Sequence, residues 1–199
     1  TIGSRFLPGY LEKFRQQYPD TEAKVRIAPS EQLEEMLLKS ELDLALLERP
    51  AKSPMLFREP YREDSLWVIA PNNGNYSPGQ GLTKESLQKE RLLLREKGSG
   101  SRDLIDKITQ DAGIVLSPIW EGISAEALLN GVKKGFGISI LPECLVQEAI
   151  RSGEVVPLKI EGIQFVRTFD LVYHKDKLLT PRMEAFLDLC RTFENVAEQ

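Results

Sequence analysis

The sequence predicts an α/β fold made of two small halves, and three observations support this class. Short apolar strands alternate with helices of about three turns, a pattern typical of βα units and a mostly parallel sheet. One stretch rich in Gly, Asn and Pro, residues 71–81, interrupts the alternation and is the first candidate boundary. The chain has 199 residues, of which 41% are apolar, enough for one domain or two small ones with proper cores.

The first half is predicted to begin with a helix, because apolar residues recur at helical spacing along 6–18. Pro8 fits the first turn of this helix, and Pro19 ends it. Ser30 is a good N-cap for a second helix. The strands predicted in this half cover 23–27, 42–47 and 65–70.

The second half repeats the alternation of helices and strands. Helices are predicted over 83–89, after the Gly-Ser-Gly-Ser turn at 98–101, after Ser124, after Pro142 and after Thr180. Strands are predicted over 91–95, 114–118, 135–141, 155–158 and 169–174. The last strand and helix can belong to either half.

Composition excludes several classes of function. The net charge of −4 makes the chain a poor candidate for direct binding to nucleic acid, which requires clustered cations. Two cysteines and one histidine are too few for a disulfide framework or a His-rich metal centre, and reduced thiols indicate a cytoplasmic protein. No apolar run approaches the roughly 18 residues of a membrane span, and the chain does not start like a signal peptide.

No group of residues predicts catalysis. Cys144 and Cys190 lie at helical spacing near apolar residues, which favours buried core thiols, and His174 closes a strand. The chain has no G-x-S-x-G nucleophile motif, and the turn at 98–101 matches neither common phosphate-binding motif. We therefore expect a protein that is not an enzyme, with no catalytic residue, no cofactor and no metal.

Small polar residues recur where a strand ends and a helix starts. The four turns are Thr1–Ser4, Ala28–Ser30, Gly98–Ser101 and Ile123–Ser124. Helix N-termini favour anions, and ligands of α/β sheets lie beyond the carboxyl ends of strands. The simpler interpretation, that each serine only caps its own helix, remains open. The nearest cations are Arg102 and Arg5.

Five motifs in register resemble one family. They are Leu7-Pro8 after a Thr-x-Gly start, Phe14-x-x-x-Tyr18-Pro19-Asp20, Glu41-Leu42-Asp43-Leu44-Ala45-Leu46, Gly98-Ser99-Gly100-Ser101-Arg102 and the segment from Gly135 to Pro142. Their order and spacing resemble the effector-binding domain of LysR-type transcriptional regulators over essentially the whole chain. The resemblance implies a periplasmic-binding-protein-like fold of type 2, with two Rossmann-like subdomains joined by crossover strands.

The resemblance also implies which residues line the effector site. Residues 1–70 and 167–199 would form regulatory subdomain I, and 71–166 subdomain II, with the effector in the cleft between them. Thr1, Ser30 and Ser99 match family positions that line this cleft. The expected lining is completed by Ser4, Gly100 and Ser101 in the same turns, and by Ile123 and Ser124 of a further turn, which form a wall.

The family's N-terminal winged helix-turn-helix and the first strand of its sheet are absent from this chain. The implied function is therefore ligand sensing: a small, anionic effector binds, and DNA is reached only through the absent domain. A homodimer or homotetramer is expected, with helices 6–18 and 124–134 as contributors, and no membrane partner. The alternative is a stand-alone solute-binding domain of the same architecture.

Overall fold

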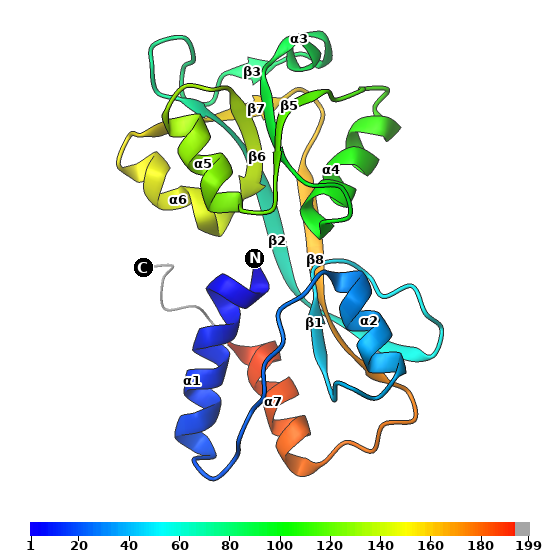
Figure 1. Ribbon diagram of the computed structural model, residues 1–199. Helices are drawn as coiled ribbons and strands as arrows, with labels where there is room; N and C mark the ends of the chain where they lie inside the picture. Colours follow the sequence, from blue (N-terminus) through cyan, green and yellow to red (C-terminus); the bar gives the residue numbers. More distant parts are fainter. Residues whose placement is uncertain (194–199) are drawn as a thin grey trace. The chain divides into compact units, whose positions relative to one another are not determined.

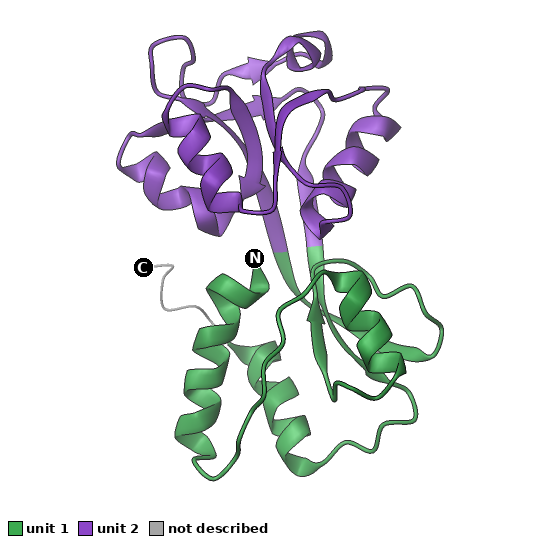
Figure 2. Ribbon diagram, in the orientation of Figure 1, with its two compact units in different colours: residues 1–63, 168–199 green, residues 64–167 purple. Residues whose placement is uncertain are grey.

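The computed structural model describes residues 1–193 and divides the chain into two compact units (Figure 2). Unit 1 combines residues 1–63 with the segment from 168 onward, and unit 2 is the continuous segment 64–167. Both boundaries fall inside strands rather than in the loop at 71–81. As a result, residues 64–70 and Arg167, which the sequence analysis assigned to subdomain I, belong to unit 2.

Unit 2 is built on a mixed sheet with helices on both faces (Figure 1). Its elements are the second part of β2 (Leu56–Pro71), β3 (Gly81–Leu82), α3 (Lys84–Lys89), β4 (Leu92–Arg95), α4 (Gly100–Asp111), β5 (Pro118–Gly122), α5 (Ala125–Lys133), β6 (Ile138–Pro142), α6 (Glu143–Arg151), β7 (Val155–Ile160) and the start of β8 (Phe165–His174). β4 runs parallel to β5 and β6, whereas β2 runs antiparallel to β6 and β7. The expectation of a mostly parallel sheet is thus too simple.

The strands of unit 2 are apolar at consecutive positions because both faces of the sheet are covered. In β4, Leu92 and Leu94 pack with Ile105 of α4, while Leu93 points to the other face and packs with Leu128 of α5. Each fully buried side chain of this kind contributes about 1.5–3 kcal/mol relative to an exposed one. The two apolar faces fix α4 and α5 on opposite sides of the same strand.

Unit 1 is smaller and uses both ends of the chain. It contains a π-helical turn η1 (Ile2–Phe6), α1 (Leu7–Gln17), α2 (Ser30–Leu38), β1 (Ala45–Leu47), the first part of β2, the second part of β8 and α7 (Pro181–Thr192). β1 pairs antiparallel with β8, with Leu47 opposite Asp170. On one face, Leu47 of β1 packs with Leu37 of α2, and on the other face Phe169 meets the ring of Phe6 edge-on.

Two predicted strands are wrong, each for a physical reason. Among the described residues, segment 23–27 forms no strand: Val25 and Ile27 are 50% and 69% exposed, and no described strand pairs with them. The strand predicted over 114–118 begins only at Pro118. The buried side chain of Ile114 belongs to the C-terminal cap of α4, where its amide donates to the carbonyl of Thr109 over 2.8 Å.

Gly137 lies between α5 and β6, where its backbone passes very close to the backbone of Arg91. A Cβ atom on this residue would lie 2.0 Å from the carbonyl oxygen of Arg91, which in turn accepts the amide of Ile138. We expect Gly137→Ala to lower the free energy of unfolding by about 1–3 kcal/mol or more, because a backbone atom cannot move aside as a side chain can. Chemical denaturation measures this change.

Gly81→Ala is the matched control, since a Cβ there meets only the flexible side chain of Glu161 at 3.7 Å. Its expected effect lies within about 0.5 kcal/mol. Equal stability of the two variants would contradict the close approach at Gly137.

Asp170 is a buried carboxyl in β8 of unit 1. Its Oδ2 atom lacks a hydrogen-bond donor, and the nearest cation, Arg58, lies 3.8 Å away with a half-exposed side chain. Burial raises the pKa of Asp170, and Arg58 only partly opposes this shift. The ionised form of this carboxyl therefore costs stability in the folded state.

The pH dependence of this cost has a definite sign. The folded state binds the proton more tightly than the unfolded chain, so stability falls as the pH rises from the unfolded-state pKa to the raised folded-state pKa. Asp170→Asn does not lose stability in this way. Its melting temperature relative to that of the wild type should therefore increase as the pH rises between the two pKa values, and the difference should remain at neutral pH. Thermal melts at stepped pH check this, with the exposed Asp20→Asn as control; parallel curves for wild type and Asp170→Asn would refute it.

Candidate functional site

The turn between β4 and α4 holds three of the site residues predicted from the sequence. Gly98 has a φ of +86°, a conformation that glycine adopts without strain, and it leads into Ser99 at the N-cap of α4. The Ser99 hydroxyl oxygen accepts the amide of Arg102 over 3.2 Å. As first-turn residues, Gly100 and Ser101 have amides without partners inside the helix. Cap and ligand roles are compatible, because the Ser99 hydroxyl keeps its own proton to donate.

Arg102 stabilises this turn and is not a free cation. Its side chain is 4% exposed; its Nε donates to both oxygens of Asp106, at 2.8 and 2.9 Å, and its Nη1 to Glu121 and to the carbonyl of Arg95, both at 2.9 Å. Burial lowers the pKa of Arg102, but the hydrogen bonds to Asp106 and Glu121 outweigh it and the pKa is raised. Arg102, which the sequence offered as one of the nearest cations, is thus already neutralised by two carboxylates of the chain.

Ser101 is tied to a buried ion pair that the sequence analysis missed. Its hydroxyl oxygen accepts from Nη1 of Arg167 over 3.1 Å, and Nε and Nη2 of the same guanidinium donate to Oδ2 of Asp64 over 2.7 Å. All three side chains are almost fully buried. In the sequence, the signal for this group was weak: Asp64 directly precedes the strand predicted over 65–70, and Arg167 stands two residues before the strand predicted over 169–174.

The turn after β5 lies beside the turn after β4, because the two strands are parallel neighbours and Arg95 pairs with Gly122. Ser124 caps α5 by accepting the amide of Ala127 over 3.2 Å, as the sequence predicted. Ile123 is strongly exposed. The structure thus brings the two turns of unit 2 to one edge of the sheet.

The remaining predicted residues, Thr1, Ser4 and Ser30, belong to unit 1. Ser30 is the first residue of α2 and not its cap: Pro29 holds the N-cap position, with no side-chain cap hydrogen bond. Thr1 precedes the π-helical turn η1, and the Ser4 hydroxyl donates to its carbonyl over 3.3 Å. Sequence patterns do not identify π-helical geometry, so the local shape of this turn was not predictable.

Two charged residues after β1 were also missed. The amide of Ile2 donates to Oε1 of Glu48 over 3.0 Å, so a carboxylate of the chain itself already uses this donor. Arg49 pairs with Oε1 of Glu34 at 2.6 Å. Their position directly after a buried strand was the available signal, since ligand-contacting residues of α/β folds gather there.

Among the described residues, Cys190 does not have the properties of a nucleophile, and metal-binding side chains do not cluster. Burial raises the pKa of Cys190 to about 12, with Arg191 opposing, so this thiol stays protonated and is a poor nucleophile at neutral pH. Among residues 1–193, no group of three or more metal-binding side chains comes together. Within the same range, every helix is too short or too polar to cross a membrane.

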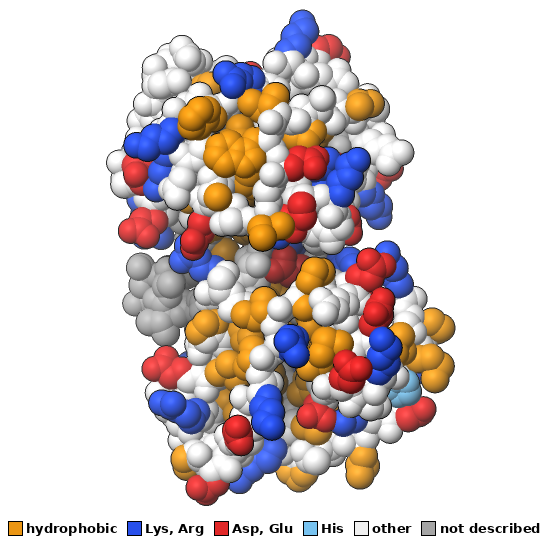
Figure 3. Space-filling view, in the orientation of Figure 1, with side chains coloured by type: hydrophobic (Ala, Val, Ile, Leu, Met, Phe, Trp, Pro, Cys, Tyr) orange, Lys and Arg blue, Asp and Glu red, His pale blue; other side chains and the backbone are white. Residues whose placement is uncertain are grey.

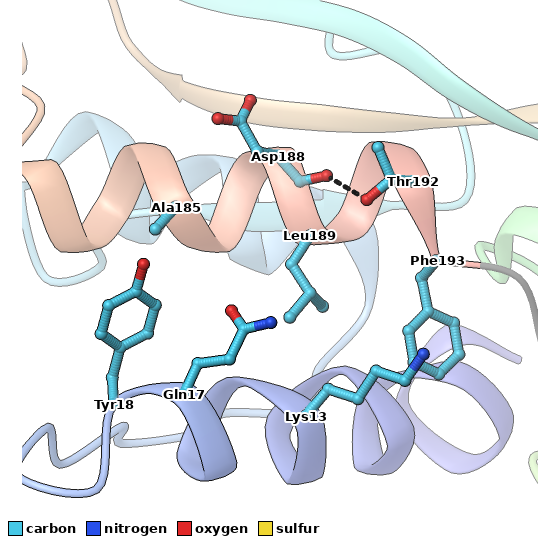
Figure 4. Close-up of a pocket in the computed structure, with 8 residues that line it drawn as sticks. All are labelled: Lys13, Gln17, Tyr18, Ala185, Asp188, Leu189, Thr192 and Phe193. Carbon is cyan, nitrogen blue, oxygen red and sulfur yellow. Dashed lines mark hydrogen bonds between the residues drawn. The ribbon is translucent and has the colours of Figure 1, made fainter.

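A groove of about 350 Å³ lies on unit 1 between α1 and α7 (Figure 4). Its lining is Lys13, Gln17, Tyr18, Ala185, Asp188, Leu189, Thr192 and Phe193. Figure 4 shows Lys13 and Gln17 rising from α1 towards α7. Lys13 lies 4.8 Å from the centre of the Phe193 ring, and Asp188 pairs with Arg191. Because its charges are engaged and no predicted site residue lines it, we place the candidate site at the strand-to-helix turns.

Comparison with curated proteins identifies relatives along nearly the whole chain. The HTH-type transcriptional activator CmpR of Synechocystis is 31% identical over 189 residues, which cover 94% of this chain and 62% of that protein. The uncharacterized HTH-type regulators YwqM of Bacillus subtilis and YeiE of Escherichia coli are 33% and 27% identical and cover 93% and 96% of this chain. The chain spans 63% and 64% of the length of those two relatives.

Solved structures similar to this chain are also regulatory or effector-binding domains. The regulatory domain of CcmR from Synechocystis, in complex with 2-PG, has a TM-score of 0.86 and 25% identity, and covers 96% of this chain and 92% of that one. The effector-binding domain of QuiR in complex with shikimate has a TM-score of 0.80 at 20% identity and covers 96% and 90%. These domains share the periplasmic-binding-protein-like type 2 fold.

The model of the LysR substrate binding domain matches residues 1–194. This match covers almost the entire sequence and agrees with both the curated relatives and the solved domains. The chain therefore belongs to the LysR substrate-binding domain family, and its relatives are bacterial LysR-type transcriptional regulators.

Proposed function

We propose that this chain is the ligand-sensing part of a LysR-type transcriptional regulator and binds a small anionic effector between its two units, which act as regulatory subdomains I and II. The observation that carries the proposal is the turn from Ser99 to Ser101. It combines a hydroxyl donor with open helix amides and follows a strand of the sheet. Family membership supports the same reading.

The chemistry of this turn favours an anion held by neutral donors. Backbone amides at a helix start carry partial positive charge, and α4 adds its dipole to them. Arg102 is already neutralised by Asp106 and Glu121, so it contributes order and little net charge. Such a site selects an oxygen-rich group by hydrogen bonding, which suits a small carboxylate, a phosphate ester or an inorganic anion.

Unit 1 contributes the second half of the proposed site through Thr1, Ser4 and Ser30. Ser30 is half-buried at the start of α2 and has no cap bond to occupy it. The Glu48 carboxylate already takes the amide of Ile2, so fewer donors are open here than at the start of α4. We therefore assign the anionic group of the effector mainly to unit 2.

The proposed output is regulatory and not catalytic. An effector shifts the balance between two conformations only by binding one of them more tightly. In this proposal, the selected conformation is passed to DNA-binding domains outside this chain, and the target is transcription. The relatives' names as transcriptional regulators support this output.

A ligand screen tests the proposal directly. Thermal shift with a panel of small carboxylates, phosphates and sulfates should identify at least one ligand, beginning with 2-PG, the ligand of the CcmR domain. A ligand at 100 times its Kd stabilises the folded state by about 2.7 kcal/mol. If no anion of the panel raises the melting temperature at millimolar concentration, the anionic effector is refuted.

Ser99→Ala should weaken binding of the identified anion by about tenfold or more. A lost hydrogen bond to a charged group costs about 1.5–3 kcal/mol, and 1.4 kcal/mol is about a factor of ten in Kd. Calorimetry measures the affinity. Thr83→Ala is the matched control: Thr83 caps α3 through a bond of the same length to the amide of Ser86, but it is not among the predicted site residues.

The two variants separate capping from ligand binding. Both should lose about 1 kcal/mol of folding stability through the lost cap. Only Ser99→Ala should also lose affinity. Unchanged affinity in the folded Ser99→Ala variant would remove this residue from the site.

We further propose that unit 2 supplies part of a self-association surface around β5 and α5. Ile119 and Trp120 on β5 are exposed, and the ring of Trp120 meets Phe136 edge-on at 6.0 Å. Hydrophobic side chains gather over this part of unit 2 in the view of Figure 3. An apolar patch on an edge strand favours association with another chain. The helix predicted over 124–134 to contribute to a dimer, here α5, borders this patch.

The Ile119→Lys variant tests this surface. We expect the wild type to form dimers in the micromolar range and Ile119→Lys to raise the dimer dissociation constant at least tenfold, because a desolvated charge opposes association. Sedimentation velocity measures both. Val115→Lys is the control, as Val115 is an exposed apolar residue of unit 2 outside β5. A wild type that stays monomeric to near-millimolar concentration would refute self-association through this chain.

A further inference from the structure

Two strands, β2 and β8, carry the chain between the units, and one ion pair joins them at the crossing. Unit 2 begins at Asp64 in β2 and ends at Arg167 in β8. Nε and Nη2 of Arg167 both donate to Oδ2 of Asp64 over 2.7 Å. The two residues are 103 positions apart in sequence, yet they are the terminal residues of the same unit. The ion pair therefore marks the place where both connections leave unit 2.

The third side of the Arg167 guanidinium is bound to α4. Nη1 donates to the hydroxyl oxygen of Ser101 over 3.1 Å, and Ser101 is the second residue of α4. Ser99, the cap of this helix, lies two residues earlier. One buried side chain thus contacts both crossover strands and the first turn of α4.

The burial of this group indicates a role other than stability. The side chains of Arg167 and Asp64 are 3% and 6% exposed, so both charges have lost most of their hydration. A buried ion pair contributes little net stability compared with apolar residues of the same volume, whereas removal of one partner is strongly destabilising. What such a pair provides is one defined geometry, because a guanidinium fork donates to its partners in a fixed plane.

We propose that Arg167 is a positioning residue that couples the first turn of α4 to the two crossover strands. A change that loosens or tightens the turn at Ser101 then loosens or tightens β2 near Asp64 and β8 near Arg167. A change in these strands likewise affects the turn. Where the proposed function holds, this coupling is the route by which an anion at the α4 turn reaches the connections between the units. The coupling itself exists without a ligand and can be tested without one.

The direction of the effect follows from the hydroxyl chemistry of Ser101. Its oxygen already accepts from Arg167, so its proton is the group that remains for donation. A hydroxyl that donates to an anion becomes a better acceptor, since linked hydrogen bonds polarise one another. A bound anion should therefore tighten the contact with Arg167 and, through it, the pair with Asp64.

Hydrogen exchange of the unliganded chain tests the coupling through Ser101→Ala. This variant removes one hydroxyl and keeps both charges, so it is expected to fold. Amides of β2 around 64 and of β8 around 167 should exchange at least threefold faster than in the wild type, together with those of the α4 turn. An increase confined to residues 99–103, or no increase, overturns the proposal.

Thr109→Val is the matched control on the same helix. Thr109 is equally buried, but its hydroxyl donates to the carbonyl of Ile105 inside α4. Its loss should change exchange in α4 and leave the crossover strands as in the wild type. If Thr109→Val also speeds exchange around 64 and 167, the effect of Ser101→Ala reflects general loosening of α4, and the proposal fails.

A second variant approaches the coupling from the strand. Arg167→Lys keeps the positive charge but cannot hold Asp64 and Ser101 with a planar fork. It should speed exchange in the first turn of α4, although Arg167 lies in β8. Unchanged exchange in this turn in the folded variant overturns the proposal.

Inorganic phosphate at saturating concentration separates this proposal from the proposed function. In the wild type it should slow exchange at the α4 turn and in both crossover strands, and in Ser101→Ala it should slow exchange at the turn only. Absence of any phosphate effect counts against an anion site at this turn, while the unliganded variants still decide the coupling. Protection of the strands in Ser101→Ala equal to that in the wild type overturns the coupling.

Discussion

The burial of both faces of the unit 2 sheet is the constraint on which the other features depend. Leu92, Leu93 and Leu94 alternate between two apolar cores, so helices must cover both sides of the strand. A chain that leaves such a strand must turn at its end to reach a helix. The turns after β4 and β5 therefore fall at one edge, with Arg95 and Gly122 as neighbours. The position of the candidate site is a consequence of how the apolar core is closed.

The electrostatics of the two units follow the same pattern: in each unit, arginine side chains are neutralised by carboxylates of that same unit. Arg102 is bound by Asp106 and Glu121, and Arg49 by Glu34. Because these charges are paired, they order the turns without creating a general attraction for anions. Hydroxyls and helix amides remain as donors, and they distinguish ligands by the geometry of their oxygens. This arrangement agrees with the proposed binding of a small anion by an acidic chain.

Local patterns predicted most of the fold, and the errors have separate physical causes. The helix caps at Ser99, Ser124 and Thr180 could be predicted from the sequence, because a cap is a contact within four residues. Segment 23–27 has strand-like composition, but a strand also needs a partner, which composition does not supply. Ile114 is apolar because it closes the end of α4. Asp64 and Arg167 could not be paired from sequence, since nothing local links positions 103 residues apart.

The division of the chain also determines the order in which it can fold during synthesis. Unit 2 is continuous, so all of residues 64–167 have been synthesised before β8 is complete and before α7 is made. Unit 1 needs both ends, because β1 pairs with β8 and α1 lies against α7. Domains generally fold as units during translation, N-terminal ones first. In this chain the order is the opposite. Residues 1–63 cannot complete unit 1 until the C-terminal segment is made, so unit 2, which contains Ser99, is the first unit that can fold.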